Sequence, residues 1–204
     1  MNPEEFEAAF DVPRGTIDRL IRYEALLREW QGRMNLVAPS TLSDIWGRHF
    51  ADSAQLARVI EPGRFWLDFG AGAGFPGLVL AAMEWGRFVL VESIAKKCRF
   101  LQEVAAEIGI SSNVSVRCGR VEALAPVRAE VVTARATAGL PTLFDWSLRH
   151  GRDGTRFVFP KGRTWATEVE AARERFQFDV QVVESVTDPE ARVLLFTGLK
   201  RKAR

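Results

Sequence analysis

The sequence predicts an α/β protein whose doubly wound, mostly parallel sheet of seven strands ends in an antiparallel hairpin and follows a helical segment. Three observations carry this prediction. Short apolar runs alternate with helical segments from residue 64 onward, the last two apolar runs are joined by a short turn, and residues 1–62 contain no convincing strand. We therefore expect a helical N-terminal extension (1–62) and an α/β domain (63–204).

The N-terminal extension is expected to hold two helices. The first begins at Thr16, a potential N-cap, and its apolar face comprises Ile17, Leu20, Ile21, Leu27 and Trp30. The second follows the Pro39-Ser40 break and interleaves apolar residues with a polar set, Arg48, His49, Asp52 and Ser53. In this set Arg48 and Asp52 are four residues apart, as are His49 and Ser53, so each pair can interact along one helix face.

The elements of the α/β domain follow in regular alternation. Strands are expected at 65–69, 88–92, 114–118, 129–134, 156–159, 180–186 and 192–199, and helices at 75–85, 94–108, 140–148 and 164–175. Strands separated by helices pair in parallel through right-handed crossovers. The last two strands are joined only by the turn Thr187-Asp188-Pro189-Glu190, which is too short for a crossover, so they must pair antiparallel.

The composition excludes several classes of protein. Lys and Arg number 28 against 26 Asp and Glu, a net charge of +2, and no apolar run is long enough for a membrane helix. The first residues are acidic where a secretory signal would be basic, and Cys98 and Cys118 give no disulfide framework. We expect a soluble cytoplasmic protein without a membrane partner, in which any nucleic-acid binding rests on local patches.

A glycine-rich turn, residues 67–77, lies between the first strand of the domain and its helix, a context in which a ligand can approach bare backbone. Two patterns overlap there. Gly72, Gly74 and Gly77 match the dinucleotide motif, with Glu92 placed to hold a ribose. The other pattern, acid-x-Gly-x-Gly-x-Gly, comprises Asp68, Gly70, Gly72 and Gly74 and is typical of methyltransferases that use S-adenosylmethionine.

Two features favour S-adenosylmethionine over NAD. The Asp68 carboxylate beside the turn would repel a pyrophosphate but attract the ammonium group of the methyl donor. The antiparallel terminal hairpin is typical of the methyltransferase sheet. An NAD-linked oxidoreductase also lacks a catalytic Tyr-Lys or His-Asp pair, because the only tyrosine, Tyr23, lies in the N-terminal helix.

Further motifs follow one another in order along the chain. They are Met34-Asn35-Leu36-Val37, Arg48-His49-Phe50-Ala51-Asp52-Ser53, Phe75-Pro76-Gly77, Lys96-Lys97-Cys98-Arg99-Phe100-Leu101, Gly119-Arg120-Val121-Glu122, Thr133-Ala134-Arg135-Ala136 and Pro160-Lys161-Gly162. With the glycine turn, this set resembles the bacterial guanine-N7 methyltransferases of 16S (small-subunit) ribosomal RNA, the glucose-inhibited division protein B family. The resemblance implies a class I methyltransferase (Rossmann-like) fold and transfer of a methyl group from S-adenosylmethionine to N7 of a guanine.

The resemblance also implies roles for individual residues. Gly70 and Phe75 would contact the methyl donor at the turn, with Asp68, Gly72 and Gly74 beside them. Glu92, where the family usually has Asp, would hold the ribose, Val121 and Glu122 would border the adenine, and Arg135 would engage the donor's carboxylate or the incoming nucleotide. Separately from the resemblance, we hypothesise that Arg48, His49, Asp52 and Lys161 line the cleft and hold the target nucleotide. An ordinary helix with an internal ion pair is the alternative for the first three.

The chemistry expected of this family needs no general base, because N7 of guanine has a free lone pair and no proton to lose. Catalysis would consist of positioning and of electrostatic tolerance for a purine that becomes cationic. We expect no metal, since two histidines and two distant cysteines supply no ligand set, and we assign His150 a structural role. A non-catalytic module that binds the cofactor or RNA stays open, as does the choice between RNA and a ribosomal particle as substrate; a monomer is expected.

Overall fold

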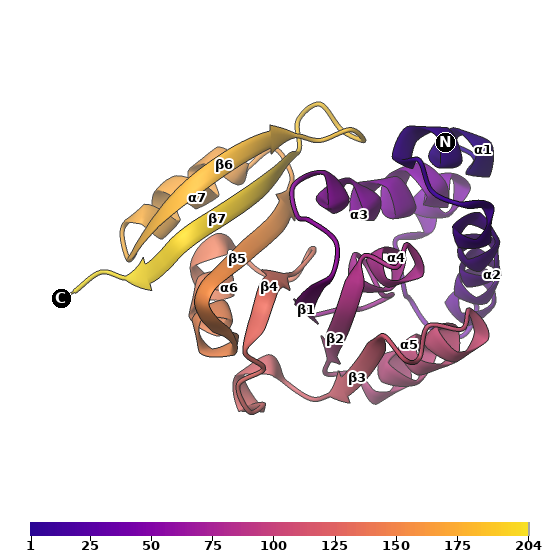
Figure 1. The fold of residues 1–204 in the computed structure, drawn as a ribbon, viewed down its shortest axis with the longest axis horizontal. Helices are drawn as coiled ribbons and strands as arrows, with labels where there is room; N and C mark the ends of the chain where they lie inside the picture. Colours follow the sequence, from indigo (N-terminus) through magenta and orange to yellow (C-terminus); the bar gives the residue numbers. More distant parts are fainter. Residues whose placement is uncertain (204) are drawn as a thin grey trace.

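The computed structural model describes residues 1–203, and its centre is one seven-stranded sheet with the order β3-β2-β1-β4-β5-β7-β6. The strands are β1 (Arg64–Phe69), β2 (Gly86–Glu92), β3 (Val114–Cys118), β4 (Ala129–Thr133), β5 (Gly151–Lys161), β6 (Phe176–Glu184) and β7 (Arg192–Arg201). Strands β1 to β5 pair in parallel, whereas β7 runs antiparallel to both β5 and β6. The predicted fold class, including the terminal hairpin, is confirmed (Figure 1).

Helices cover both faces of the sheet (Figure 1). The α-helices are α1 (Pro3–Phe10), α2 (Arg14–Gln31), α3 (Asp52–Ala54), α4 (Gly77–Ala82), α5 (Ala95–Glu107), α6 (Leu140–His150) and α7 (Trp165–Arg173). One core cluster joins α1, α2, α4 and α5 to sheet residues such as Trp66, Phe88 and Val158. The other joins α6 and α7 to sheet residues such as Phe69, Phe159 and Phe196. Residues 1–62 therefore share a hydrophobic core with the sheet.

The N-terminal region differs from the sequence prediction in several ways, and the first is an additional helix, α1. Helix α2 begins at Arg14 after Pro13, so Thr16 is not its N-cap but a buried residue inside it, and Ile21 is 41% exposed. The expected second helix is a series of short turns, η1 (Pro39–Asp44), the π-helical η2 (Trp46–Ala51), α3 and η3 (Gln55–Arg58). A π-turn inserts an extra residue per turn, which strict four-residue spacing does not anticipate.

Elsewhere the predicted elements are present and their ends shift by a few residues. Helix α4 is shorter than expected at both ends, while β5 begins five residues earlier, at Gly151, and β6 begins at Phe176 instead of Val180. Strand β6 is longer because β7 supplies partners as far as Arg201, whereas β5 begins early where Gly151 pairs with Ala129 of β4. No helix among residues 1–203 has both the length and the apolar character that crossing a membrane would require.

Candidate functional site

The glycine turn follows β1 and leads into α4 at the carboxyl end of the parallel strands. Gly70, Gly72 and Gly74 have φ angles of 68°, 56° and 94°, a region that side chains with a Cβ rarely adopt. A Cβ on Gly74 would also lie 2.5 Å from the Tyr23 hydroxyl and from Leu78. Glycine is therefore required at Gly74 for both conformation and space.

Helix α2 packs against this turn. The Tyr23 hydroxyl, fully buried, donates a hydrogen bond to the carbonyl of Ala73, and the Tyr23 ring stacks on Phe75 with centroids 5.6 Å apart. Burial raises the pKa of Tyr23 well above its ordinary value, so the hydroxyl remains a donor. The N-terminal region thus fixes the backbone on which a ligand would lie.

Asp68 lies beneath the turn and is fully buried. Its Oδ2 accepts a hydrogen bond from the Gly77 amide at 2.9 Å, while no donor from residues 1–203 reaches its Oδ1. Burial raises the pKa of Asp68 to about 8, against the opposing effects of the Gly77 amide and Arg135. A buried carboxyl oxygen without a partner is costly, and a cationic group bound beside it would satisfy it.

Glu92, at the end of β2, holds the turn from the other side. Its Oε1 accepts from the Ile94 amide at 2.8 Å and from the Ser93 hydroxyl at 3.4 Å, whereas its Oε2 accepts only from the Gly72 amide among residues 1–203, at 2.9 Å, and keeps a lone pair for a ligand hydroxyl. Both cysteines meet here, which corrects the expectation that they are distant. Cys98 donates to the Glu92 carbonyl and Cys118 pairs with Glu92 in register; burial and the Cys118 thiol raise the pKa of Cys98 to about 12.

A pocket of about 150 Å³ opens beside the turn. Its lining includes Gly70, Val121 and Glu122, as expected, and also two residues that the sequence did not single out, Thr137 and Trp146. Trp146 packs edge-on against Phe69 with ring centroids 5.9 Å apart. A flat apolar wall beside carboxylates and bare backbone is suited to an adenine base and its ribose.

His150 stabilises the wall of this pocket from behind. Its Nε2 donates to the Val121 carbonyl at 2.9 Å, and the side chain is fully buried. Burial lowers the pKa of His150, so it is neutral around pH 7. This geometry agrees with the structural role expected of it.

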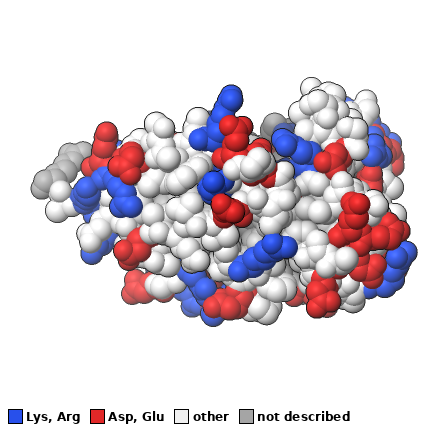
Figure 2. Space-filling view, turned by 90° about the horizontal axis from the view of Figure 1, so that it is seen from above, with Lys and Arg blue, Asp and Glu red and all other residues white. Residues whose placement is uncertain are grey.

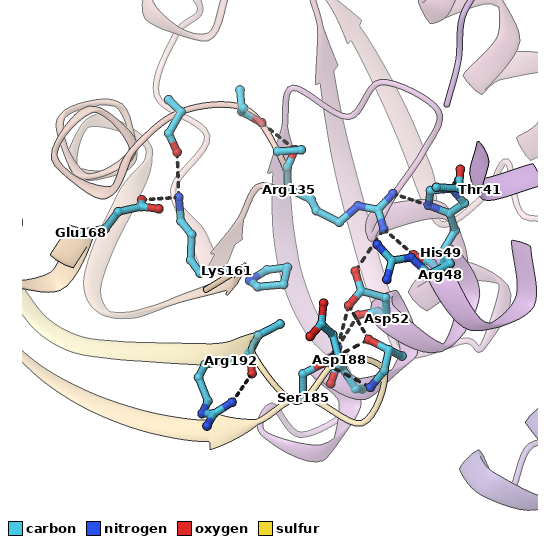
Figure 3. Close-up of a pocket in the computed structure, with 18 of the residues that line it drawn as sticks. Thr41, Arg48, His49, Asp52, Arg135, Lys161, Glu168, Ser185, Asp188 and Arg192 are labelled. Atoms are coloured by element: carbon cyan, nitrogen blue, oxygen red, sulfur yellow. Dashed lines mark hydrogen bonds and ion pairs between the residues drawn. The ribbon is translucent and has the colours of Figure 1, made fainter. Parts of the chain in front are cut away.

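A second and larger pocket, about 620 Å³, lies next to the first, and we call it the cleft. Its walls are the irregular helical segment, the loop after β4, the end of β5 and the β6–β7 turn (Figure 3). All four residues predicted to position a substrate line it, namely Arg48, His49, Asp52 and Lys161, together with Arg135. Thr137 lines both pockets, so the two meet at this residue.

Arg135 is the centre of the hydrogen-bond network in the cleft (Figure 3). Its Nη1 donates to Asp52 Oδ2 at 3.1 Å and its Nη2 to His49 Nδ1 at 2.9 Å. The guanidinium also lies over the Phe75 ring, 4.7 Å from its centroid, and His49 stacks on the same ring at 4.8 Å. The expected Arg48–Asp52 pair is absent among residues 1–203, because Asp52 pairs with Arg135 instead.

His49 is held as a neutral imidazole of one tautomer. Because Arg135 can only donate, Nδ1 must accept, so Nε2 carries the proton and donates to Thr41 Oγ1 at 2.8 Å. Burial, followed by the charges of Arg135 and Arg48, lowers the pKa of His49 to about 3, although Asp44 opposes this. Ser53 contacts only the backbone of His49, donating to its carbonyl. His49 therefore orients Arg135 and is not available as a base.

Hydrogen bonds between separate segments of the chain join the opposite sides of the cleft. Lys161 donates to the Ala138 carbonyl and to Glu168, at 2.7 and 2.8 Å, and is only 11% exposed. Thr187, in the β6–β7 turn, donates to Asp52 Oδ1 at 3.0 Å. Gln55 bonds both Ser185 and the Val186 amide of that turn. No motif in the sequence indicated these hairpin contacts.

The residues present suit S-adenosylmethionine. They combine an unsatisfied buried carboxyl oxygen on Asp68, a glycine backbone in the left-handed region, a carboxylate at Glu92 and an apolar wall at Trp146. Residues 1–203 contain no group of three or more His, Cys, Asp or Glu side chains arranged to hold a metal ion.

Sequence comparisons identify a family that matches most of the chain. A family described as rRNA small subunit methyltransferase G matches residues 16–194. The ribosomal RNA small subunit methyltransferase G of Rhodospirillum centenum is 47% identical over 191 residues, covering 93% of this chain and 88% of its own. Its counterpart in Paramagnetospirillum magneticum is 45% identical over 202 residues, covering 98% of both chains.

Solved structures agree at the level of the fold. An S-adenosylmethionine-dependent methyltransferase from Aquifex aeolicus has a TM-score of 0.59 at 14% identity, covering 85% of this chain and 96% of its own. An O-methyltransferase from Bacillus cereus has a TM-score of 0.58 at 15% identity, covering 86% and 90%. The match across residues 16–194 and the full-length relatives show that the chain belongs to the rRNA small subunit methyltransferase G family.

Proposed function

We propose that this protein transfers the methyl group of S-adenosylmethionine to N7 of a guanine in 16S (small-subunit) ribosomal RNA. The observation that carries the proposal is the pair of pockets that meet at Thr137. One pocket suits an adenosine and the other, about 620 Å³, is wide enough for a nucleotide. The family membership supports the same reaction.

In this proposal the smaller pocket and the glycine turn hold the methyl donor. Its ammonium group interacts with Asp68, its ribose with Glu92 and its adenine with Val121, Glu122 and Trp146, while Gly70, Gly72, Gly74 and Phe75 form the surface beneath it. When bound, S-adenosylmethionine supplies an electrophilic methyl group on a sulfonium. Arg135 lines the cleft two positions before Thr137, where it can contact the donor's carboxylate or the nucleotide.

The side chains of the cleft position the guanine and do not activate it. N7 has no proton to lose, so the reaction needs an aligned approach and no base. His49 is compatible with a reaction that needs no base, because both of its nitrogens are already hydrogen-bonded, one to Arg135 and the other to Thr41. Arg48, Asp52 and Lys161 complete the walls, and Lys161 is held by Glu168 where it can also meet a phosphate.

RNA would be recognised by individual residues held in fixed positions and not by an extended basic surface. Figure 2 shows acidic and basic side chains interspersed on the face seen from above, with no continuous basic surface. Local phosphate contacts still make binding salt-dependent. We propose that the protein acts as a monomer on ribosomal RNA, either free or within a particle.

Methylated nucleosides in small-subunit RNA test the proposal directly. RNA from cells lacking the gene should lose one N7-methylguanine, detected by nuclease mapping and mass spectrometry, and purified protein with S-adenosylmethionine should restore it. Persistence of every N7-methylguanine contradicts the proposal. Binding of labelled S-adenosylmethionine without methyl transfer would favour the non-catalytic alternative, and tight binding of NAD would favour the oxidoreductase.

A further inference from the structure

Three carboxylates line the cleft, and two of them are fully engaged by the protein. Asp52 accepts from Arg135 through one oxygen and from Thr187 and Gln55 through the other. Glu168 accepts from Lys161 and the Leu140 amide through Oε2 and from Thr164 through Oε1. These two carboxylates maintain the walls of the cleft.

The third carboxylate, Asp188, is fixed in place yet keeps an oxygen free. It lies in the β6–β7 turn, where its Oδ1 accepts from the Glu190 amide at 2.9 Å and its carbonyl from the Ala191 amide at 3.1 Å. Its neighbour Thr187 is anchored to Asp52. No donor from residues 1–203 bonds to its Oδ2, and no Lys or Arg there pairs with it.

The position of Asp188 suits the far edge of a bound purine. Figure 3 shows it on the hairpin side of the cleft, away from the loop after β4, which carries Thr137 and borders the smaller pocket. A guanine that presents N7 toward the smaller pocket directs its N1–H and N2 amino donors away from it. A carboxylate accepts both donors, whereas the N1 atom of adenine would face it as a second acceptor.

We propose that Asp188 is a specificity-determining residue that reads the N1 and N2 donors of the target guanine. The inference rests on the proposed guanine-N7 reaction and names the residue that selects its base. Methylation makes the purine ring cationic, so these charge-assisted hydrogen bonds strengthen as the methyl group is transferred. Asp188 therefore favours the transition state as well as binding.

The test combines variants of the turn with two substrates. Small-subunit RNA carries either guanosine or inosine, which lacks the N2 amino group, at the methylated position, introduced by ligation of synthetic RNA. Asp188→Asn keeps the acceptor for the Glu190 amide but places an NH₂ group opposite the guanine donors, and Asp188→Ala removes both interactions. Glu190→Gln alters the next acidic residue of the same turn and is the matched control.

We expect the unaltered protein to prefer guanosine over inosine by about tenfold in kcat/KM, as for loss of one hydrogen bond to a charged group. Asp188→Ala and Asp188→Asn should lower kcat/KM on guanosine RNA by about 30-fold and reduce the guanosine preference to about onefold. Glu190→Gln should stay within twofold of the unaltered protein. All four proteins should bind S-adenosylmethionine equally and melt at similar temperatures.

Other outcomes overturn the inference. If the Asp188 variants lose rate but retain the full guanosine preference, Asp188 only supports the turn; if they match the unaltered protein, it has no role in the reaction. Failure of the proposed function is visible separately, because the unaltered protein would then place no methyl group on N7 of guanosine RNA, and the inference about Asp188 would fall with it.

Discussion

The smaller pocket takes its floor from backbone and small residues of one continuous turn, whereas the cleft takes its walls from charged side chains on four separate segments. Gly70, Gly72 and Gly74 lie within five residues of one another, while Arg135 meets Asp52 across 83 positions and Thr187 meets Asp52 across 135. The first site is therefore set by local conformation and the second by tertiary folding. Substitutions in the smaller pocket and in the cleft should therefore have different effects.

The largest effect is expected at the turn. Gly74→Ala places a Cβ in a residue with φ of 94° and within 2.5 Å of Tyr23 and Leu78. We expect a loss of roughly 2–4 kcal/mol in the free energy of unfolding and loss of measurable S-adenosylmethionine binding. Urea unfolding and calorimetry measure the two quantities.

Gly109→Ala is the matched control for Gly74. Gly109 has φ of 72° but open space around a Cβ, so only the conformational cost of about 1–2 kcal/mol applies. Equal destabilisation by the two variants would show that the contact with Tyr23 is unimportant.

The next effect belongs to the cleft. Arg135→Ala removes the hydrogen bonds to Asp52 and His49, and we expect kcat/KM for methyl transfer to fall about 100-fold, or about 2.7 kcal/mol. Arg135→Lys keeps the positive charge but lacks the planar guanidinium group. It should therefore regain less than a tenth of the kcat/KM that Arg135→Ala loses. Full activity in Arg135→Lys would mean that charge alone matters. Unfolding curves check that both variants remain folded.

A smaller effect is the pH dependence of stability, to which Asp68 near the smaller pocket and His49 in the cleft contribute in opposite directions. The pKa of Asp68 is raised from 3.8 to about 8, so its contribution to stability is lost as pH rises across that window. His49, lowered from 6.5 to about 3, contributes in the opposite direction, with stability rising as pH rises to 6.5. Between pH 6.5 and 8 only Asp68 of the two acts, and stability should fall by up to about 1.4 kcal/mol per pH unit.

Urea unfolding across pH 6.5 to 8 checks this slope. Asp68→Asn cannot titrate, so its stability should be flat in this range, whereas His49→Gln should leave the slope unchanged. A slope that persists in Asp68→Asn would assign the titration to another group.

The smallest effect concerns the apolar wall of the first pocket. Adenine bound against Trp146 should quench its fluorescence, and Trp146→Phe should abolish the quenching while weakening S-adenosylmethionine binding only about fivefold, about 1 kcal/mol. Trp165→Phe, on α7, is the control and should retain the signal. Undiminished quenching in Trp146→Phe would place the adenine elsewhere.

The same contrast explains what the sequence could predict. The glycine turn, the alternation of strands and helices and the terminal hairpin follow from local patterns, because periodicity and turn length are local properties. The order of the strands in the sheet is a tertiary property and was not predicted. Arg135 could be predicted as a ligand-contacting residue because ligands gather at the carboxyl ends of parallel strands. The contacts of Thr187 and Gln55 depend on how β7 enters the sheet, and the π-turn at His49 broke the helical spacing, so neither could be read from the chain.

The order of strands has a consequence for synthesis on the ribosome. β7 leaves the exit tunnel after β5 and β6 but lies between them, so in this sheet β6 has no neighbour until β7 arrives. The turn that reaches Asp52 therefore docks only after β7 has been made. A nascent chain that stops before Arg192 contains the whole glycine turn but lacks the strand that joins β6 to the sheet, so we expect it to have no assembled cleft.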